Sequence, residues 1–337
     1  MRKAILFFTT TLLLSGMSCS PKDVTKINGI SFVGSRDKIE ADAITPVTEV
    51  NANWSAVMPF AFSRSTTESN LMYNDKRQWW GEREEGAEET CRLLKQQGLK
   101  VMLKPQIWIW GGVFTGTIRM SNEKQWQAFE ASYEAYILAN AKLAQKVNAE
   151  LFCIGTEMYG FVEARPQFWE RLIQKVRSVY DGKLTYAENW DSFHKVPFWE
   201  QLDYIGIDAY FPLSETKTPQ VEELRKAWQK HKEQIRKVQQ TTGIPVLFTE
   251  YGYRSIDFTA KEPWKFDSDS GQINTSAQNN ALMALYEEFW PEKWFAGGFL
   301  WKWFDYHHRA GGITNKQFTP QNKPAEIIVR DFYGRWP

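Results

Sequence analysis

Short, continuous apolar runs recur along the chain and alternate with longer amphipathic stretches. Continuous runs of four to eight residues, unlike strictly alternating ones, are typical of parallel strands that are covered on both faces. The runs are GISFVG (from Gly29), WSAVMPFAF (from Trp54), KVMLKPQIW (from Lys100), ELFCIGTEM (from Glu150), KLTYAENW (from Lys183), DYIGIDAYF (from Asp203), PVLFTEYGY (from Pro245) and FAGGFLWKW (from Phe295). The pattern therefore predicts eight parallel strands.

The stretches between these runs predict helices, because apolar residues recur there at helical spacing and capping residues stand at the ends. Their predicted first or capping residues are Ser121, Pro166, Thr218, Asn274 and Ala325. Strands that alternate with helices or crossover loops build a (β/α)8 TIM barrel of the α/β class. No linker rich in Pro, Gly or Ser divides the sequence, so we predict one catalytic domain over residues 28–337.

The N-terminus has the features of a targeting segment rather than of a fold. Arg2 and Lys3 precede a short apolar run, and small residues then lead to Cys19. This order is typical of a secretory signal and resembles a bacterial lipoprotein cleavage site. We predict a signal over residues 1–18, lipidation of Cys19, a tether over residues 19–27 and an exported protein at the periplasm or cell surface. Simple secretion remains the alternative, because Gly16 stands where such sites usually have Leu.

Two further cysteines, Cys91 and Cys153, lie in apolar surroundings. They are expected to be buried free thiols, with a disulfide between them as the open alternative.

Aromatic residues make up 15% of the chain, including 16 Trp. A large core would explain them, and so would a cleft lined with flat rings that suit the C–H faces of sugars. The net charge of +1, without a basic block, argues against nucleic acid as a partner. The four histidines lack metal-binding spacing, and there is no nucleophile elbow, P-loop or dinucleotide fingerprint, so we expect no metal and no cofactor.

Two glutamates, Glu157 and Glu250, stand at the ends of the fourth and seventh predicted strands. In this barrel the carboxyl ends of the strands form the catalytic face. Each glutamate could be half of a structural ion pair, but two such carboxyls across the barrel mouth also match glycoside hydrolysis. There one carboxyl donates a proton and the other, about 5–5.5 Å away, attacks the anomeric carbon.

Six motifs in order, each at a strand end, resemble glycoside hydrolase family 113 within clan A of retaining glycosidases. They are NWSAVMPFAF, GLKVMLKPQIWIWGG, ELFCIGTEM, YIGIDAYFPL, VLFTEYGYR and GGFLWKWF. The resemblance runs from about Gly29 to Tyr333 and implies an endo-β-1,4-mannanase that acts on a polysaccharide or oligosaccharide, without a cofactor. We expect a monomer.

The resemblance implies that Glu157 is the general acid/base and Glu250 the nucleophile. Two positions depart from the usual pattern. Thr156 stands where most of clan A has Asn, and Gln106 stands where several relatives have His, so the sugar at the cleavage point is less defined than the mechanism.

Other residues at the same face are expected to support these two carboxyls. We predict that Tyr210 donates a hydrogen bond to Glu250, and that Asp208 binds a sugar hydroxyl or orients a neighbour. Lys104 is expected to bind a hydroxyl or to lower the pKa of a nearby carboxylate, with a buried structural ion pair as the open alternative. The aromatic and amide side chains predicted to contact sugars are Trp301 as the platform under the cleaved unit, and Trp108, Asn189, Trp190 and Tyr253 on the same face.

Two other functions remain open at this point. The same mechanism could act on xylan, glucan or galactan. Alternatively, the chain could be a catalytically silent, lipid-anchored glycan-binding barrel, although such a protein has no need to retain both glutamates.

Overall fold

A closed parallel barrel forms the centre of the protein, as seen in a computed structural model that describes residues 25–265 and 271–336. Within this part of the chain, eight strands follow one another around the barrel in the order β1-β11-β10-β9-β8-β7-β5-β2. They are β1 (Ile27–Phe32), β2 (Trp54–Val57), β5 (Lys100–Leu103), β7 (Leu151–Thr156), β8 (Lys183–Asn189), β9 (Tyr204–Asp208), β10 (Val246–Tyr251) and β11 (Phe295–Trp303). Each strand overlaps a predicted apolar run, so the predicted TIM barrel is confirmed.

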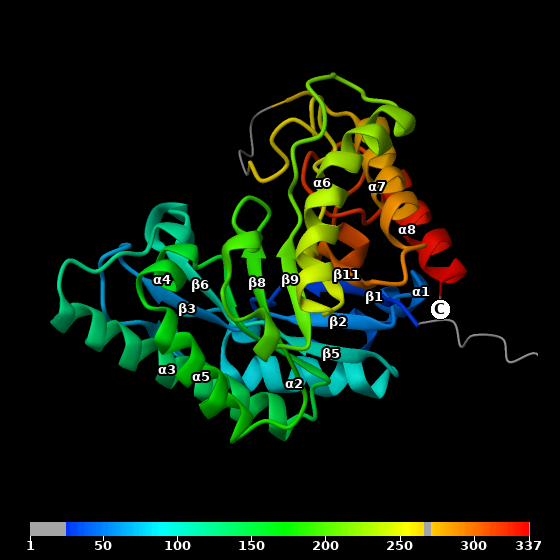
Figure 1. Ribbon diagram of the computed structural model, residues 1–337. Coiled ribbons are helices and arrows are strands. Elements are labelled where there is room, and N and C mark those ends of the chain that lie inside the picture. Colours follow the sequence, from blue (N-terminus) through cyan, green and yellow to red (C-terminus); the bar gives the residue numbers. More distant parts are fainter. Residues whose placement is uncertain (1–24, 266–270, 337) are drawn as a thin grey trace, which may run out of the picture.

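Helices surround this barrel (Figure 1). They are α1 (Thr45–Glu49), α2 (Glu84–Gln96), α3 (Glu123–Lys146), α4 (Tyr159–Ala164), α5 (Pro166–Arg177), α6 (Val221–Thr242), α7 (Thr275–Phe289) and α8 (Pro324–Arg335). The crossover from β8 to β9 carries two short 3-10 helices instead, η5 (Phe193–Lys195) and η6 (Trp199–Gln201). Figure 1 shows α6, α7 and α8 packed side by side on one flank of the barrel.

Two predicted helix starts were wrong by a few residues. Asn122, not Ser121, caps α3, because its side-chain oxygen reaches the backbone N–H of Gln125 at 3.0 Å. Helix α6 begins at Val221, after Gln220, rather than at Thr218. The predicted cap Asn274 and the first-turn Pro166 are confirmed.

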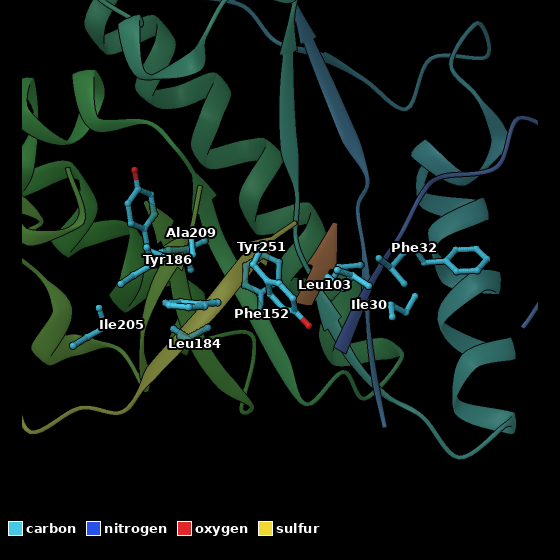
Figure 2. Close-up of a cluster of buried hydrophobic side chains, with 14 of the residues drawn as sticks. Ile30, Phe32, Leu103, Phe152, Leu184, Tyr186, Ile205, Ala209 and Tyr251 are labelled. Atoms are coloured by element: carbon cyan, nitrogen blue, oxygen red, sulfur yellow. The ribbon is translucent and has the colours of Figure 1, made fainter. Parts of the chain in front are cut away.

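Side chains of the barrel strands pack into two separate cores, as the two-residue alternation of a strand requires. Inward-facing residues fill the barrel and form the inner core: Ile27, Trp54, Ala56, Met102, Leu151, Cys153, Ala187, Tyr204, Leu247 and Phe299. Outward-facing residues such as Ile30, Leu103 and Phe152 pack under the helices and form the outer core (Figure 2). Beyond this core, at the strands' carboxyl ends, the same inward stripe continues with polar residues such as Lys104.

Two of the predicted strands continue past the rim of the barrel. Pro59 and Pro105 lack a backbone N–H and mark the ends of the barrel strands there, and the chain continues as β3 (Phe60–Ser63) and β6 (Gln106–Ile109). The two segments stay paired, because the N–H groups of Lys104 and Gln106 donate to Val57 O and Pro59 O, each at 2.9 Å. Together with β4 (Met72–Tyr73), β3 and β6 form a three-stranded sheet in the order β4-β3-β6. Figure 1 shows β3 and β6 extending in line with β2 and β5.

Cys91 and Cys153 are both buried free thiols, so they are not joined by a disulfide. The predicted signal, the lipidated Cys19 and most of the tether lie outside the described residues. Among the residues that are described, no helix has both the length and the apolar character needed to cross a membrane.

Candidate active site

Glu250 lies near the end of β10, and three side chains donate hydrogen bonds to its carboxyl group. Lys104 Nζ and Gln106 Nε2 both donate to Oε1, at 2.5 and 2.9 Å, and the hydroxyl of Tyr210 donates to Oε2 at 2.9 Å. The Glu250 side chain is only 7% exposed. A buried carboxyl group that accepts three hydrogen bonds is fixed in orientation.

Lys104 joins this carboxylate to a second one. Its ammonium group lies 3.1 Å from Asp208 Oδ1, and the Thr249 hydroxyl donates to the same Asp208 oxygen at 2.7 Å. Both Lys104 and Asp208 are fully buried. The single cation therefore neutralises part of the charge of two carboxylates on adjacent strands, β9 and β10.

Glu157 follows β7 directly and has an unusual backbone conformation. Its φ of 51° lies in the left-handed region, which is costly for a residue with a Cβ and is often found at functional sites. Hydrogen bonds hold the backbone there: its N–H donates to Ala187 O at 2.7 Å, and the Thr115 hydroxyl donates to its carbonyl at 3.1 Å. Strand β8 and the loop after β6 thus fix the backbone of Glu157, from which its side chain extends.

The electrostatic surroundings separate the two glutamates. Burial of the carboxyl, together with the negative charges of Asp208 and Glu250, raises the pKa of Glu157 well above its usual range. Burial and the charge of Glu250 likewise raise the pKa of Asp208 to about 7. Burial alone would lower the pKa of Lys104, but Asp208 and Glu250 outweigh it and raise that pKa above its ordinary value. Glu157 is therefore set up to carry a proton, and Lys104 to keep its charge.

Another glutamate, the buried Glu188 on β8, supports Glu157 indirectly. Tyr186 donates through its hydroxyl to Glu188 Oε2 at 2.8 Å, and the same hydroxyl accepts from the Met158 N–H at 2.9 Å. Glu188 Oε1 accepts from Ser192 Oγ and from the Asn189 N–H, each at 2.9 Å. This network fixes the residue next to Glu157. Sequence reasoning missed it, although a glutamate just before the end of the fifth barrel strand was the feature that could have indicated it.

Aromatic side chains predicted to contact sugars lie in different environments. Trp301 ends up half-buried near the end of β11, with Lys302 Nζ 5.2 Å from its ring. Trp190 is half-buried and stacks on Trp264, with ring centroids 5.2 Å apart. Trp108 lies on β6 and is 43% exposed.

Asn189 and Tyr253, which were also predicted to contact sugars, lie in different surroundings. Asn189 ends β8, in register with Asp208, and donates through Nδ2 to Asp191 at 3.1 Å. Tyr253 is 1% exposed and packs in the outer core, so the structure does not bring its ring to an open surface with the others.

The described residues contain no group of three His, Cys, Asp or Glu side chains arranged to hold a metal ion. The features that do meet at the carboxyl ends of the strands are two glutamates on the fourth and seventh strands and a hydrogen-bonding set around one of them. A TIM barrel with a pair of carboxyls at these positions is the arrangement on which two-carboxylate glycosidases are built.

Comparison with known proteins gives the family. Residues 34–323 match the sequence profile of Glycoside Hydrolase Family 113. This match covers most of the chain, and the protein belongs to glycoside hydrolase family 113. A search of curated protein sequences gave no significant match.

Solved structures show the same fold. The GH113 β-mannanase AaManA from Alicyclobacillus acidocaldarius, in complex with ManMIm, superposes with a TM-score of 0.82 at 24% identity, over 94% of this chain and 99% of that one. A complex structure of a GH113 β-1,4-mannanase has a TM-score of 0.78 at 25% identity, over 92% and 99% of the two chains. The Ruminococcus gnavus β-glucuronidase shares the fold more distantly, with a TM-score of 0.60 at 13% identity over 93% of this chain and 50% of that one.

Proposed function

We propose that the protein hydrolyses a β-1,4-linked polysaccharide with retention of configuration, with Glu157 as general acid/base and Glu250 as nucleophile. The observation that carries this proposal is the difference between the two carboxyl environments. Glu250 accepts hydrogen bonds from Lys104, Gln106 and Tyr210, whereas burial and neighbouring negative charge raise the pKa of Glu157. The three donors orient Glu250, as a nucleophile requires, and the raised pKa of Glu157 favours its protonated form, as an acid requires.

In the first step, Glu157 gives its proton to the glycosidic oxygen while an oxygen of Glu250 attacks the anomeric carbon. The bond between that carbon and the leaving oxygen breaks, and a covalent glycosyl ester forms on Glu250. The donors on the Glu250 carboxylate orient it for attack. Trp301, at the end of β11, supplies a ring face that suits the sugar and the positive charge developing on it.

In the second step, Glu157 acts as a base. Once Glu250 is esterified it has no charge, so one of the causes of the raised pKa of Glu157 disappears. Glu157 can then take a proton from water, whose oxygen attacks the anomeric carbon and releases Glu250. Two displacements at one carbon restore the original configuration.

Mannan is the substrate that the comparisons support. Both family 113 structures named above are described as β-mannanases, and we propose the same linkage and sugar for this chain, with cleavage inside the polymer. Initial rates on matched manno-, xylo-, gluco- and galacto-oligosaccharides test this choice. Release of products from another series, with none from the manno-series, would replace mannan by that glycan and leave the mechanism intact.

The roles of the two glutamates are tested with Glu157→Ala and Glu250→Ala. Each should lower kcat/KM by at least about a thousandfold, because each removes a group that takes part in bond breaking. Glu163→Ala is the matched control, because Glu163 is an exposed carboxylate on the nearby α4. Wild-type turnover in either active-site variant would overturn the assignment.

Azide distinguishes the two roles. In Glu250→Ala, azide should restore activity and give a glycosyl azide of inverted configuration, because it replaces the nucleophile. In Glu157→Ala, azide should intercept the glycosyl ester and give a product of retained configuration. The opposite pairing would exchange the roles proposed for the two residues.

A further inference from the structure

The inward-facing stripe of β2 does not end at the rim of the barrel. Trp54 belongs to the inner core. Met58, four residues further along the chain, is buried next to Gln106. Phe60 and Phe62 on β3 follow at a spacing of two residues, and both are half-buried. Because strand side chains alternate, these phenylalanines lie on the continuation of the barrel's inner surface.

The neighbouring segment has the same arrangement. Met102 belongs to the inner core, Lys104 and Gln106 contact Glu250, and Trp108 comes two residues later on β6. Two residues of strand span roughly 6.6 Å, which is about the length of one sugar unit. The Trp108 position therefore lies about one sugar beyond a residue that contacts the proposed nucleophile.

Strand pairing places these side chains on one face. Phe60 is in register with Gln106 and Phe62 with Trp108, while Met72 on β4 is in register with Phe62. In-register residues on adjacent strands point to the same side of a sheet. We call the four apolar side chains on this face, Phe60, Phe62, Met72 and Trp108, the rim platform.

The opposite face of this small sheet is occupied. Ala61, Ser63 and Ile109 are buried there, and Tyr73 packs on Tyr136 of α3 with ring centroids 5.0 Å apart. By contrast, Met72 and Trp108 are 41% and 43% exposed, and no member of the rim platform belongs to either hydrophobic core. Three uncharged aromatic rings thus remain partly open to solvent on the side that continues from the active site.

We propose that the rim platform binds further sugar units of a neutral β-linked glycan whose scissile linkage lies between Glu157 and Glu250. Flat rings pack on the C–H faces of sugars, and a surface without charges suits a neutral chain. Its continuity with Gln106 and Glu250 selects a glycan over another occupant, because a chain that leaves the active site along this strand passes directly over it. The inference rests on the proposed function and adds that longer chains are preferred.

The experiment measures kcat/KM on β-1,4-linked manno-oligosaccharides of two to six units, for the wild type and for the Phe62→Ala/Trp108→Ala double variant. The ratio of kcat/KM for the hexasaccharide to that for the disaccharide should fall roughly tenfold or more in the variant, because two stacking rings are lost. Ile327→Ala, which truncates an exposed side chain on α8, is the control and should keep the wild-type ratio. An unchanged ratio in the double variant would overturn the inference.

Calorimetric binding of the hexasaccharide to Glu157→Gln, with and without Trp108→Ala, separates this inference from the proposed function. If the wild type cleaves these glycans and Trp108→Ala does not weaken binding, the rim platform inference fails while the proposed function stands. If the wild type cleaves no glycan, the proposed function fails. The inference then stands only if Trp108→Ala weakens calorimetric binding of the hexasaccharide to Glu157→Gln.

Should the double variant not fold, the Trp108→Ala single variant gives the same ratio test. A dimer in solution that Trp108→Ala dissociates would show that a second copy covers the platform, and would also overturn the inference.

Discussion

Lys104 is a fully buried cation that two carboxylates share. Its ammonium group contacts Glu250 at 2.5 Å and Asp208 at 3.1 Å. Burying one cation with two anions is costly to desolvate and leaves a net negative charge in the barrel mouth. That charge contributes to keeping a proton on Glu157, so the ion pair serves the chemistry as well as the fold.

Replacing Lys104 by Met should lower both activity and stability. Removing one member of a buried ion pair costs about 3–5 kcal/mol, and kcat/KM should fall about a hundredfold because Glu250 loses a donor. Lys104 also lowers the pKa of Glu157, so its loss should move the alkaline limb of the pH–rate profile to higher pH. Steady-state kinetics across pH and urea unfolding measure these effects.

Lys95→Met is the control for that experiment, because Lys95 forms an ion pair with Glu150 that is partly exposed. It should change stability by no more than about 1 kcal/mol and leave the pH profile in place. An unchanged alkaline limb in Lys104→Met would contradict the electrostatic role given to Lys104.

At the residue scale, sequence reasoning identified the partners whose position follows from strand alternation. Tyr210 donates to Glu250 as predicted, and Asp208 and Lys104 lie beside it. Gln106 was noted only as a departure from relatives, although it lies two residues beyond Lys104 in the same predicted run. Strand alternation could therefore have placed its side chain beside Glu250.

Strand β8 carries a buried acidic residue, Glu188, which is linked through Tyr186 to Met158, the residue after Glu157. Burial raises the pKa of Glu188 to about 7, from an ordinary value of 4.5. The folded protein therefore holds this proton more tightly than the unfolded chain does. The stability contributed by protonated Glu188 is fully present below about pH 4.5 and is lost as the pH rises through 7.

Glu188→Gln should remove that pH dependence. Between pH 4 and pH 8 the unfolding free energy of the variant, relative to wild type, should rise by roughly 3 kcal/mol. Its alkaline limb should move to lower pH, because the Glu188 charge is one cause of the raised pKa of Glu157. Urea unfolding at several pH values and kinetics measure both, with the exposed Glu200→Gln as control. Parallel stability curves for Glu188→Gln and wild type would contradict the assignment.

At the scale of elements, apolar runs predicted the barrel strands well, because buried parallel strands need continuous hydrophobic sequence. Connections were less predictable. Helix α2 was not named, and the crossover from β8 to β9 contains only η5 and η6. The break of two predicted strands at Pro59 and Pro105 was also missed, since a proline at a rim does not interrupt the apolar pattern.

At the scale of the whole molecule, a buried asparagine links the first barrel strand to the helices at the C-terminal end of the chain. Asn28 on β1 donates through Nδ2 to Tyr333 O at 3.2 Å and to Trp336 O at 2.6 Å, and its Oδ1 accepts from Trp290 Nε1 at 2.8 Å. The first strand is thereby tied to the end of α8 and to the residue that follows α7. The last residues of the domain are part of its closure.

Asn28→Ala should destabilise the fold by about 2–4 kcal/mol, because several polar groups lose their partner in a buried place. Guanidinium unfolding measures the change. Asn70→Ala, at an exposed position, should stay within about 0.5 kcal/mol of wild type. A similar effect of the two substitutions would show that Asn28 does not hold the two ends of the chain together.

Pro59 and Pro105 mark the boundary between the closed barrel and the small sheet β4-β3-β6. The strand register is the same on both sides of them, with Val57 opposite Leu103 and Phe60 opposite Gln106, so the barrel sets the position of the small sheet. Apart from Gln106, which donates to Glu250, the side chains of the small sheet can vary while the proposed reacting carboxyls keep their positions. Preference for polymer length could evolve, or be engineered, as a trait independent of bond cleavage.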